Sequence, residues 1–494
     1  MTGGISTPLI LEELLVSGGD ARILVDARGR NRYGCTITPD NGLVALGSST
    51  ASVISDAAFD EANRFYRHLL HAANSAPTTQ IYNREMERIR AELLQVCGLD
   101  ASRIDIIFAA SGTDIHLIAA QIAAQDLSTL AITVDIAETG GGVPAALAGK
   151  HFSSCTALGD QVAQLSQVAG CTTLNVVNIA IRNSDGSPRD TRDVDAEATQ
   201  LVEKAIAEHQ QVLLILVDVS KTGLIAPSPA CVLALKGRFA KQVNVMVDAC
   251  QFRISPATLQ AYLEQGFMVA LTGSKFISGP TFSGALLFNK SSEISSIPGL
   301  SRYSSRSDWP YHLQSGTALE DYANIGLLLR WQAALHELRA FLNVPQTEVA
   351  RFLQRFADAV QKYLQSNKHF DALPTPVLNR QPVVAGNSWD TIPTIFPFLL
   401  RHADGKHLSR EQTVQIYQDL QINLSAQYEN PVAAVRGQLG QPVMCGERDG
   451  HPASALRVCA SARMVVEASQ GNADAVIKRS LAVLDKALLL LEKL

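Results

Sequence analysis

The chain has 494 residues, of which 47% are hydrophobic and 18% are charged, a composition that can bury a sizeable core. Its length suggests about two to four domains, or one large domain with a satellite. Lys and Arg number 42 against 47 Asp and Glu, and this net charge of −5 argues against a dedicated nucleic-acid-binding protein.

Targeting and metal-binding patterns are also missing from the sequence. No apolar run approaches the roughly 18 residues that a membrane helix needs, and Glu12 and Glu13 stand where a signal peptide would be apolar. The eight cysteines form no CxxC pair, so neither a disulfide framework nor a zinc site is expected. We therefore expect a cytoplasmic protein without a membrane, nucleic-acid or metal partner.

Residues 1–85 predict an N-terminal arm and a helix over Ser55–Ala73. From 86 to 320, short runs that are apolar throughout alternate with helical segments. Such strands are typical of a sheet covered on both faces, so we predict an α/β domain with a mainly parallel, seven-stranded sheet between helices. The predicted strands are Ile104–Ala109, Leu130–Asp135, Leu174–Ala180, Val212–Val217, Val243–Val247, Met268–Thr272 and Gly284–Phe288. The predicted helices are Asp114–Gln125, Val194–His209 and Ala257–Gln265.

The pattern changes over 321–494, where helices dominate. A long amphipathic helix over Leu319–Leu342 links the two parts, and a second helix follows over 350–367. A loop rich in proline then precedes a strand over Ala455–Ala460 and a closing helix over 472–493. We interpret this part as a smaller C-terminal α+β domain.

Polar residues follow two of the predicted strands. Asp248 ends one strand, with Gln251 three residues on, and Lys275 follows the next strand, after Thr272 and Ser274. Ligands bind at the carboxyl ends of strands in such sheets, so we expect these side chains to share a site. A half-buried lysine can form a Schiff base with an aldehyde cofactor, and a carboxylate can keep a pyridinium ring protonated. Taken singly, each residue also suits an ordinary strand end or surface loop.

A turn of small residues, Ser111-Gly112-Thr113, separates the first of these strands from a helix that begins at Asp114. The free N–H groups and the positive dipole of a helix N-terminus favour a bound phosphate. Ser, Thr and Asp are also common helix caps, so a capping role is the alternative.

The order of these pieces resembles the fold-type I pyridoxal-phosphate enzymes, specifically the group of class V aminotransferases and cysteine desulfurases. The resemblance covers about residues 85 to 340, and the C-terminal part loosely. The family motif D-x-x-Q is matched by Asp248 and Gln251, and S-x-[HS]-K by Thr272, Ser274 and Lys275. The turn N-E-x-G is matched by Ser220-Lys221-Thr222-Gly223, and R-x-G-T by Gln314-Ser315-Gly316-Thr317.

The resemblance implies an aspartate aminotransferase-like fold, a large pyridoxal-phosphate-binding domain over 86–320, and a homodimer with shared active sites. It implies that Lys275 holds the cofactor as a Schiff base and that Asp248 meets the pyridine nitrogen. Gln251 and Ser220 would meet the ring oxygen, and Thr139 would lie over the ring where desulfurases have a stacked His. The residues expected at the phosphate are Ser111, Gly112, Thr113, Thr272, Ser274 and Thr317 of the partner subunit.

The resemblance also implies a substrate, a small amino acid whose carboxylate is gripped by Arg457, with Arg463 as the nearest competitor. Amino transfer is the predicted reaction, because it needs nothing beyond this set of residues. The alternatives are a carbon–sulfur lyase or cysteine desulfurase that uses Cys445, and a non-catalytic protein that retains the fold. A nicotinamide oxidoreductase, suggested by a loose glycine fingerprint over 140–145, is the most distant alternative.

Overall fold

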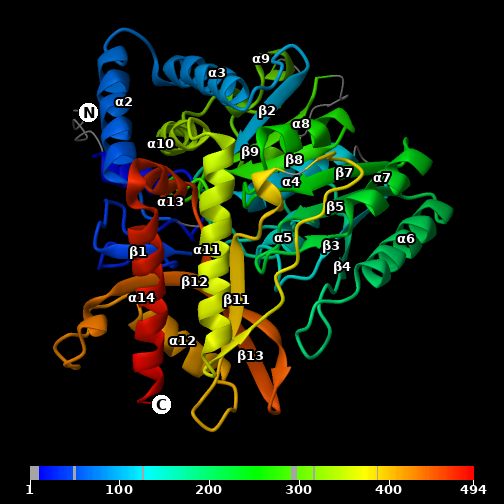
Figure 1. Cartoon of the computed structure of the whole chain (residues 1–494). Helices are drawn as coiled ribbons and strands as arrows, with labels where there is room; N and C mark the ends of the chain where they lie inside the picture. The colour runs from blue at the N-terminus through cyan, green and yellow to red at the C-terminus, as the bar shows by residue number, and fades with distance from the viewer. Residues whose placement is uncertain are drawn as a thin grey trace.

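The computed structural model describes residues 10–47, 52–124, 127–290, 298–314, 318–386 and 388–493. It contains a large and a small β-sheet with helices packed around them (Figure 1). In Figure 1 the small sheet, around β12 and β13, lies below the large sheet.

The large sheet is formed by strands from the middle of the chain. They are β2 (Ile104–Ala109), β3 (Thr129–Val134), β4 (Asn175–Ile179), β5 (Gln211–Asp218), β6 (Ile225–Ala226), β7 (Val243–Asp248), β8 (Met268–Thr272) and β9 (Gly284–Asn289). Their order is β2-β9-β8-β7-β5-β3-β4, with β6 paired to β5 beside this path. The strands β4, β3, β5, β7 and β8 run parallel, and β9 is antiparallel to both of its neighbours. The carboxyl ends of the parallel strands therefore meet at one edge of the sheet, and that of β9 lies at the other.

Helices alternate with these strands. They are α4 (Gly112–Ala124), α5 (Val143–Leu147), α6 (Thr191–Ala207), α7 (Pro229–Arg238) and α8 (Pro256–Glu264). Side chains of Asp190, Ser228 and Ser255 accept hydrogen bonds from the first turns of α6, α7 and α8, so each helix starts at a polar cap. The predicted α/β architecture with a mainly parallel sheet is confirmed, and the two-residue strand β6 is an addition to the seven predicted strands.

The small sheet combines the C-terminal part with the N-terminal arm. Its order is β1 (Leu43–Leu46), β12 (Arg436–Arg448), β13 (His451–Cys459), β11 (Ile395–Leu400) and β10 (Phe370–Ala372). The arm strand β1 pairs in parallel with β12, and the other pairs are antiparallel. Only β13 was predicted in the C-terminal part. The strand β12 was missed because Gly437, Gly440 and Pro442 are typical of turns.

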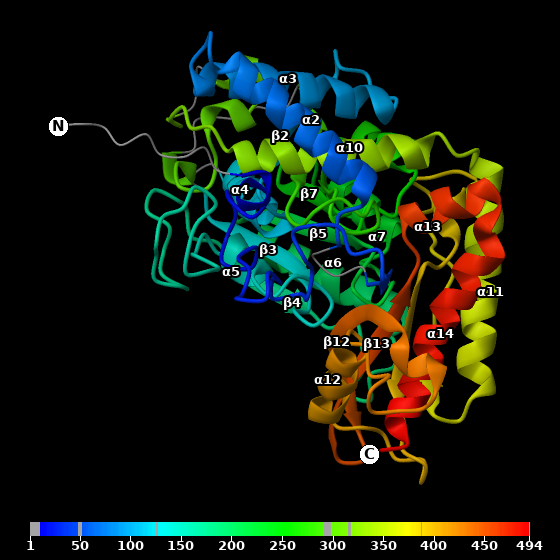
Figure 2. The ribbon, with the colours of Figure 1, turned by 90° about the vertical axis from the view of Figure 1, so that its left-hand side faces the viewer.

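The remaining helices surround both sheets. They are α1 (Leu11–Leu15), α2 (Asp56–Ala72), α3 (Thr78–Val96), α9 (Tyr311–Gln314), α10 (Ile325–Leu342), α11 (Gln346–Ser366), α12 (Arg410–Asp419), α13 (Ala462–Glu467) and α14 (Ala473–Leu491). Figure 2 shows α2 and α3 against α10, and α11 beside α14. The linking helix begins later than predicted, because Asn324 caps it by accepting a 3.0 Å hydrogen bond from the Leu327 backbone. Within the described ranges, no helix is long and apolar enough to cross a membrane.

Candidate active site

Polar side chains from separate segments meet at the carboxyl ends of the parallel strands. Thr139 follows β3, Lys221 follows β5, Asp248 ends β7 and Lys275 follows β8. With Arg457 from β13, they line a cavity of about 110 Å³. Its other lining residues are Glu138, Gly140, Val217, Val219, Gln251, Gln441, Pro442 and Val443. The structure thus gathers Thr139, Asp248, Gln251, Lys275 and Arg457, which the sequence had predicted to act together.

The carboxylate of Asp248 is buried against His116 from α4. The Nε2 atom of His116 lies 3.3 Å from Oδ2 of Asp248, and its Nδ1 lies 2.7 Å from the carbonyl oxygen of Gly112. Burial alone would raise the pKa of Asp248, but His116 and Lys275 beside it hold that pKa well below its usual range. The sequence alone suggests a packing or surface role for His116, and nothing in its local pattern indicates that it contacts Asp248. Asp248 therefore presents a fixed negative charge to the cavity.

Arg457 and Gln251 line the cavity, and each has a buried hydrogen-bonding atom without a described partner. Arg457 is 1% exposed and donates from Nη1 to the Lys221 carbonyl at 3.1 Å and from Nη2 to the Gln441 carbonyl at 2.6 Å. Its Nε and the Oε1 of Gln251 have no hydrogen-bond partner among the described residues. No described carboxylate forms an ion pair with Arg457, and burial lowers its pKa. A buried, unpaired guanidinium indicates a site for an anionic ligand.

The turn after β5 is built on Glu138. The Glu138 carboxylate accepts hydrogen bonds from Arg182 at 2.6 Å, from the Ser220 hydroxyl at 2.7 Å and from the Thr222 hydroxyl at 2.6 Å. Burial would raise the pKa of Glu138, but Arg182 and these hydroxyls lower it. The turn closes at Gly223, whose φ of 88° favours glycine. Because its hydroxyl is held by Glu138, the expected contact of Ser220 with a cofactor remains a prediction.

Lys221 is a second amine in the cavity, and sequence analysis did not assign it a function. Its Nζ donates to the Ile136 carbonyl at 3.3 Å, and no described carboxylate lies within ion-pair distance of it. Burial, together with the charges of Arg457 and Lys275, lowers the pKa of Lys221 to about 8. The available signal was the lysine itself, at the position where the family turn carries a glutamate.

The predicted phosphate turn lies at the N-terminus of α4, beside the N-terminal arm. The Ser111 hydroxyl donates to Asp114 and accepts from Nη2 of Arg22 at 3.1 Å. Burial and the nearby Asp20 raise the pKa of Asp114 to about 7. At Gly112 a Cβ atom would lie only 2.8 Å from the Cys250 sulfur, so this position has no room for a side chain.

The other residues predicted for the phosphate are held by neighbouring groups or lie outside the described ranges. The Thr272 hydroxyl donates to the Cys250 carbonyl at 2.6 Å, and the Ser274 carbonyl accepts from Ser52 at 3.2 Å. Like Thr113, they do not appear in the lining of the small cavity. Thr317 lies outside the described residues. Their contacts with a phosphate therefore remain predictions.

The cavity residues fit the ring of pyridoxal phosphate, the cofactor predicted from the sequence. Asp248 supplies an ionised carboxylate, Gln251 an unused amide oxygen and Lys275 an amine. These are the groups that a protonated pyridine nitrogen, a ring hydroxyl and an aldehyde need. On the phosphate side, the first turn of α4 at Gly112 supplies the helix N-terminus that favours an anion.

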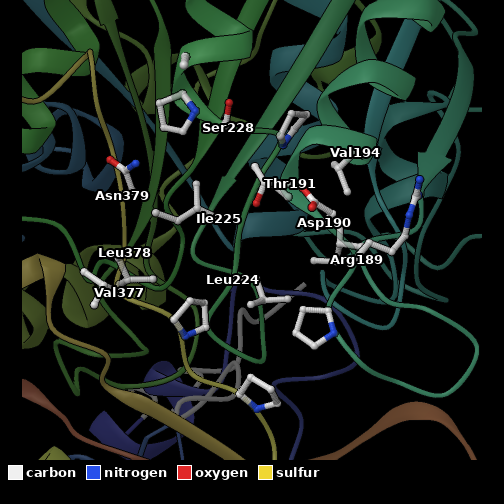
Figure 3. A pocket seen from close by; sticks show the side chains of 18 of the residues that line it. Arg189, Asp190, Thr191, Val194, Leu224, Ile225, Ser228, Val377, Leu378 and Asn379 are labelled. Atoms are coloured by element: carbon white, nitrogen blue, oxygen red, sulfur yellow. The ribbon is translucent and has the colours of Figure 1, made fainter.

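A larger cavity of about 650 Å³ lies between the start of α6, β6 and the loop over 374–381 (Figure 3). Much of its lining is aliphatic side chains and proline, and the charged residues in it are Arg189 and Asp190. Arg189 is paired with Glu197 at 2.8 Å, and Asp190 caps α6. Because its charges are already satisfied and no predicted site residue lines it, we place the chemistry in the smaller cavity.

Solved structures share this architecture, although no protein-family model and no curated protein matches the sequence. A NifS-like protein from Rickettsia africae ESF-5 has 12% identity and a TM-score of 0.52, over 90% of this chain and 99% of that one. This chain has the NifS-like fold. The complex of the cystine C-S lyase C-DES with its reaction product cysteine persulfide has 14% identity and a TM-score of 0.53, over 88% and 98%. A C-DES mutant with glycine covalently linked to the PLP cofactor aligns with a TM-score of 0.51 at 14% identity.

The NifS-like fold of this chain holds Cys445 away from the small cavity. Cys445 lies on β12 and is 1% exposed, and its sulfur contacts the Gly186 carbonyl at 3.6 Å. Burial raises the pKa of its thiol. A reactive cysteine needs a lowered pKa and access to its target, and Cys445 has neither in this structure.

Proposed function

We propose that the chain is a pyridoxal-phosphate-dependent lyase that eliminates a sulfur leaving group from a small amino acid. The observation that carries this proposal is the meeting of Lys275, Asp248 and Arg457 in one cavity whose described lining contains no thiol. Elimination needs a base, an anchor for the cofactor ring and an anchor for the substrate carboxylate. It needs no cysteine from the protein.

The same residues would bind the cofactor. Lys275 would hold it covalently, Asp248 would face the ring nitrogen, and Gln251 would offer its unused oxygen to the ring hydroxyl. His116 supports this arrangement, because it helps to keep Asp248 ionised. When bound, pyridoxal phosphate withdraws electrons from the substrate Cα and makes its proton removable.

Side chains of the chain would then carry out the remaining steps. Arg457 would bind the substrate α-carboxylate with its guanidinium, which lines the cavity and has no ion-pair partner among the described residues. The Nζ of Lys275 would take the proton from Cα as a general base. The bond between Cβ and sulfur breaks, and the sulfur departs with the bonding electrons. Val219 and Pro442 line the same cavity and would limit the access of water.

Three alternatives have less support. A desulfurase needs a thiolate that reaches the substrate sulfur, whereas Cys445 is buried beside Gly186. Amino transfer was the first prediction, but the neighbour named for its reaction is a cystine C-S lyase. A protein that kept only the fold would leave buried atoms of Gln251 and Arg457 unpaired without gain.

The proposal also includes the assembly of the protein. We propose a cytoplasmic homodimer in which Thr317 of the partner subunit lies at the phosphate.

Product analysis with L-cystine tests the reaction. The proposal predicts that the cofactor-loaded protein converts one cystine and one water into pyruvate, ammonia and cysteine persulfide, in equal amounts. Release of alanine from cysteine would instead identify a desulfurase. Transfer of the amino group to an added keto acid, with no free ammonia, would identify an aminotransferase. Either of these outcomes overturns the lyase assignment.

A further inference from the structure

Three cations line the small cavity, Arg457, Lys221 and Lys275, and none of them forms an ion pair within the described ranges. Arg457 is buried and Lys221 is half-buried, and both line the cavity. They are in direct contact, because Nη1 of Arg457 donates to the Lys221 carbonyl at 3.1 Å. Within the described ranges, no carboxylate lies within 4 Å of the charged nitrogens of either residue. The hydrogen bond joins the Arg457 guanidinium to the Lys221 backbone, and the positive charge of Arg457 also acts on the Lys221 amine and lowers its pKa. Two neighbouring cations of one cavity without an ion-pair partner indicate a ligand with negative charge.

The acidic groups nearest to Lys221 are already engaged. The charges that act on Lys221 come from Arg457 on β13, Lys275 after β8, and Glu138 and Asp135 after β3. Glu138 is paired with Arg182 and two hydroxyls. Asp135 accepts from the backbone N–H groups of residues 137 and 181. Neither carboxylate neutralises the Lys221 ammonium by direct contact.

The proposed cofactor would use one more amine of the cavity. Lys275 would join the cofactor, and Asp248 would face its ring, which leaves Arg457 and Lys221 for the substrate. The single negative charge of one carboxylate balances only one of these two cations. We propose that Lys221 binds a second anionic group of the substrate, carried on its β-carbon, while Arg457 binds the α-carboxylate.

This inference rests on the proposed lyase function and narrows its substrate class. The substrate would be a short amino acid whose sulfur leaving group carries negative charge: an S-sulfonate, which departs as thiosulfate, or a thiolate, which takes up a proton from water and departs as hydrosulfide. Elimination from such a substrate expels an anion, and an ammonium group next to that anion stabilises the charge as it departs. The small volume of the cavity, about 110 Å³, also favours a short side chain.

Binding of simple acids to the cofactor-free full-length protein tests the site without any reaction. Succinate carries two carboxylates separated by two carbons, as the α-carboxylate and a β-anion would be, and butyrate is its single-charge analogue. We expect isothermal titration calorimetry at pH 7 to show succinate binding at least about 10-fold tighter than butyrate. Above pH 8 this preference should fall by about 10-fold per pH unit as Lys221 loses its proton.

Matched variants assign the preference to one amine. Lys221→Met should abolish the preference and leave butyrate binding intact, whereas Lys275→Met should keep the preference. Lys221→Arg should keep it and remove its decline above pH 8. If Lys221→Met loses butyrate as well, the Lys221→Arg result decides, because an unchanged decline above pH 8 would show that another group titrates.

Equal affinities for the two acids in the wild-type protein, or a preference that disappears only in Lys275→Met, overturn the inference. The proposed function fails by a different measurement. Absence of pyruvate and ammonia from cystine, from cysteine and from S-sulfocysteine would reject the lyase and leave the acid-binding result standing.

Discussion

The ring-facing and phosphate-facing halves of the candidate site differ in how their side chains are used. On the ring side, Gln251 and Arg457 line the cavity and have buried atoms without a described partner. On the phosphate side, the hydroxyl groups of Ser111 and Thr272 already donate hydrogen bonds to other groups of the protein. Unused buried donors and acceptors are costly, so they point to the half where a ligand completes the structure.

The difference also shows that the N-terminus of a helix does not by itself identify a phosphate site. The first turn of α4 is suited to a phosphate, but Asp20, Arg22 and Asp114 gather beside it and form their own network. A bound phosphate would have to be accommodated next to two buried carboxyl groups. The proposal for the ring half therefore rests on groups of the protein itself, whereas the phosphate half depends on how this network responds to a ligand.

The largest effect on the ring half is expected from Lys275→Ala. Loss of the covalent anchor and of the general base should lower turnover by at least about 10⁴-fold, because both roles rest on one amine. Borohydride reduction of the cofactor-loaded wild type, followed by peptide mass mapping, should find the label on Lys275. Lys241→Ala removes an exposed lysine and serves as the control, with normal turnover. A label on Lys221 instead would exchange the roles of the two amines.

Replacement of Arg457 by Lys should raise KM about 10- to 100-fold with a smaller change in kcat. Lysine keeps the charge but loses the forked donors that hold a carboxylate. Arg463→Lys is the control, because Arg463 lies outside the cavity and is paired with Glu337 at 2.8 Å. That variant should lower the thermal midpoint and leave KM unchanged. An equal rise of KM in both variants would contradict the assignment of the carboxylate site.

The large sheet could be predicted because most of its strands are short apolar runs that can be recognised in the sequence without knowing their partners. β2 and β3 are buried at every position and are apolar almost throughout. β1 could not be predicted in the same way. Its four residues, Leu43–Leu46, become a strand by pairing with Arg436–Leu439, almost four hundred positions along the chain. Such pairing depends on tertiary contact rather than on local pattern.

In the candidate site, too, some contacts follow from the order of the strands and others depend on tertiary structure. Asp248 and Lys275 could be predicted to meet, because residues that follow parallel strands share one sheet edge. The support of Asp248 by His116 could not, because it depends on how α4 is rotated against β7. The position of Lys221 in the cavity also could not be predicted, because its neighbours Arg457 and Ile136 come from distant segments of the chain.

On the phosphate half, Asp114→Asn should remove a pH dependence of stability. The pKa of Asp114 is raised from 3.8 to about 7, so the folded protein keeps a proton that the unfolded chain has lost. The contribution of this proton to the free energy of unfolding is fully present below pH 3.8 and decreases as the pH rises. Above about pH 7 it has been lost and no longer changes. Between pH 5 and 7 the unfolding constant of the wild type should therefore rise about 10-fold per unit relative to Asp114→Asn. Chemical denaturation at several pH values measures this, with exposed Asp60→Asn as the control.

Parallel stability curves for the wild type and Asp114→Asn would show that Asp114 is ionised throughout that range. The Arg22 network would then carry one more negative charge than we infer. A phosphate at the N-terminus of α4 would be correspondingly disfavoured.

The smallest effect is expected from Cys445→Ala. Its sulfur contacts the Gly186 carbonyl outside the cavity, so elimination should proceed at an unchanged rate. The loss of a buried sulfur should lower the free energy of unfolding by about 1 kcal/mol, as in Cys459→Ala, which removes another buried thiol of the small sheet. Product formation and thermal unfolding measured on both variants separate the two effects. A rate lost in Cys445→Ala but kept in Cys459→Ala would mean that β12 moves to deliver this thiol, and the desulfurase would replace the lyase.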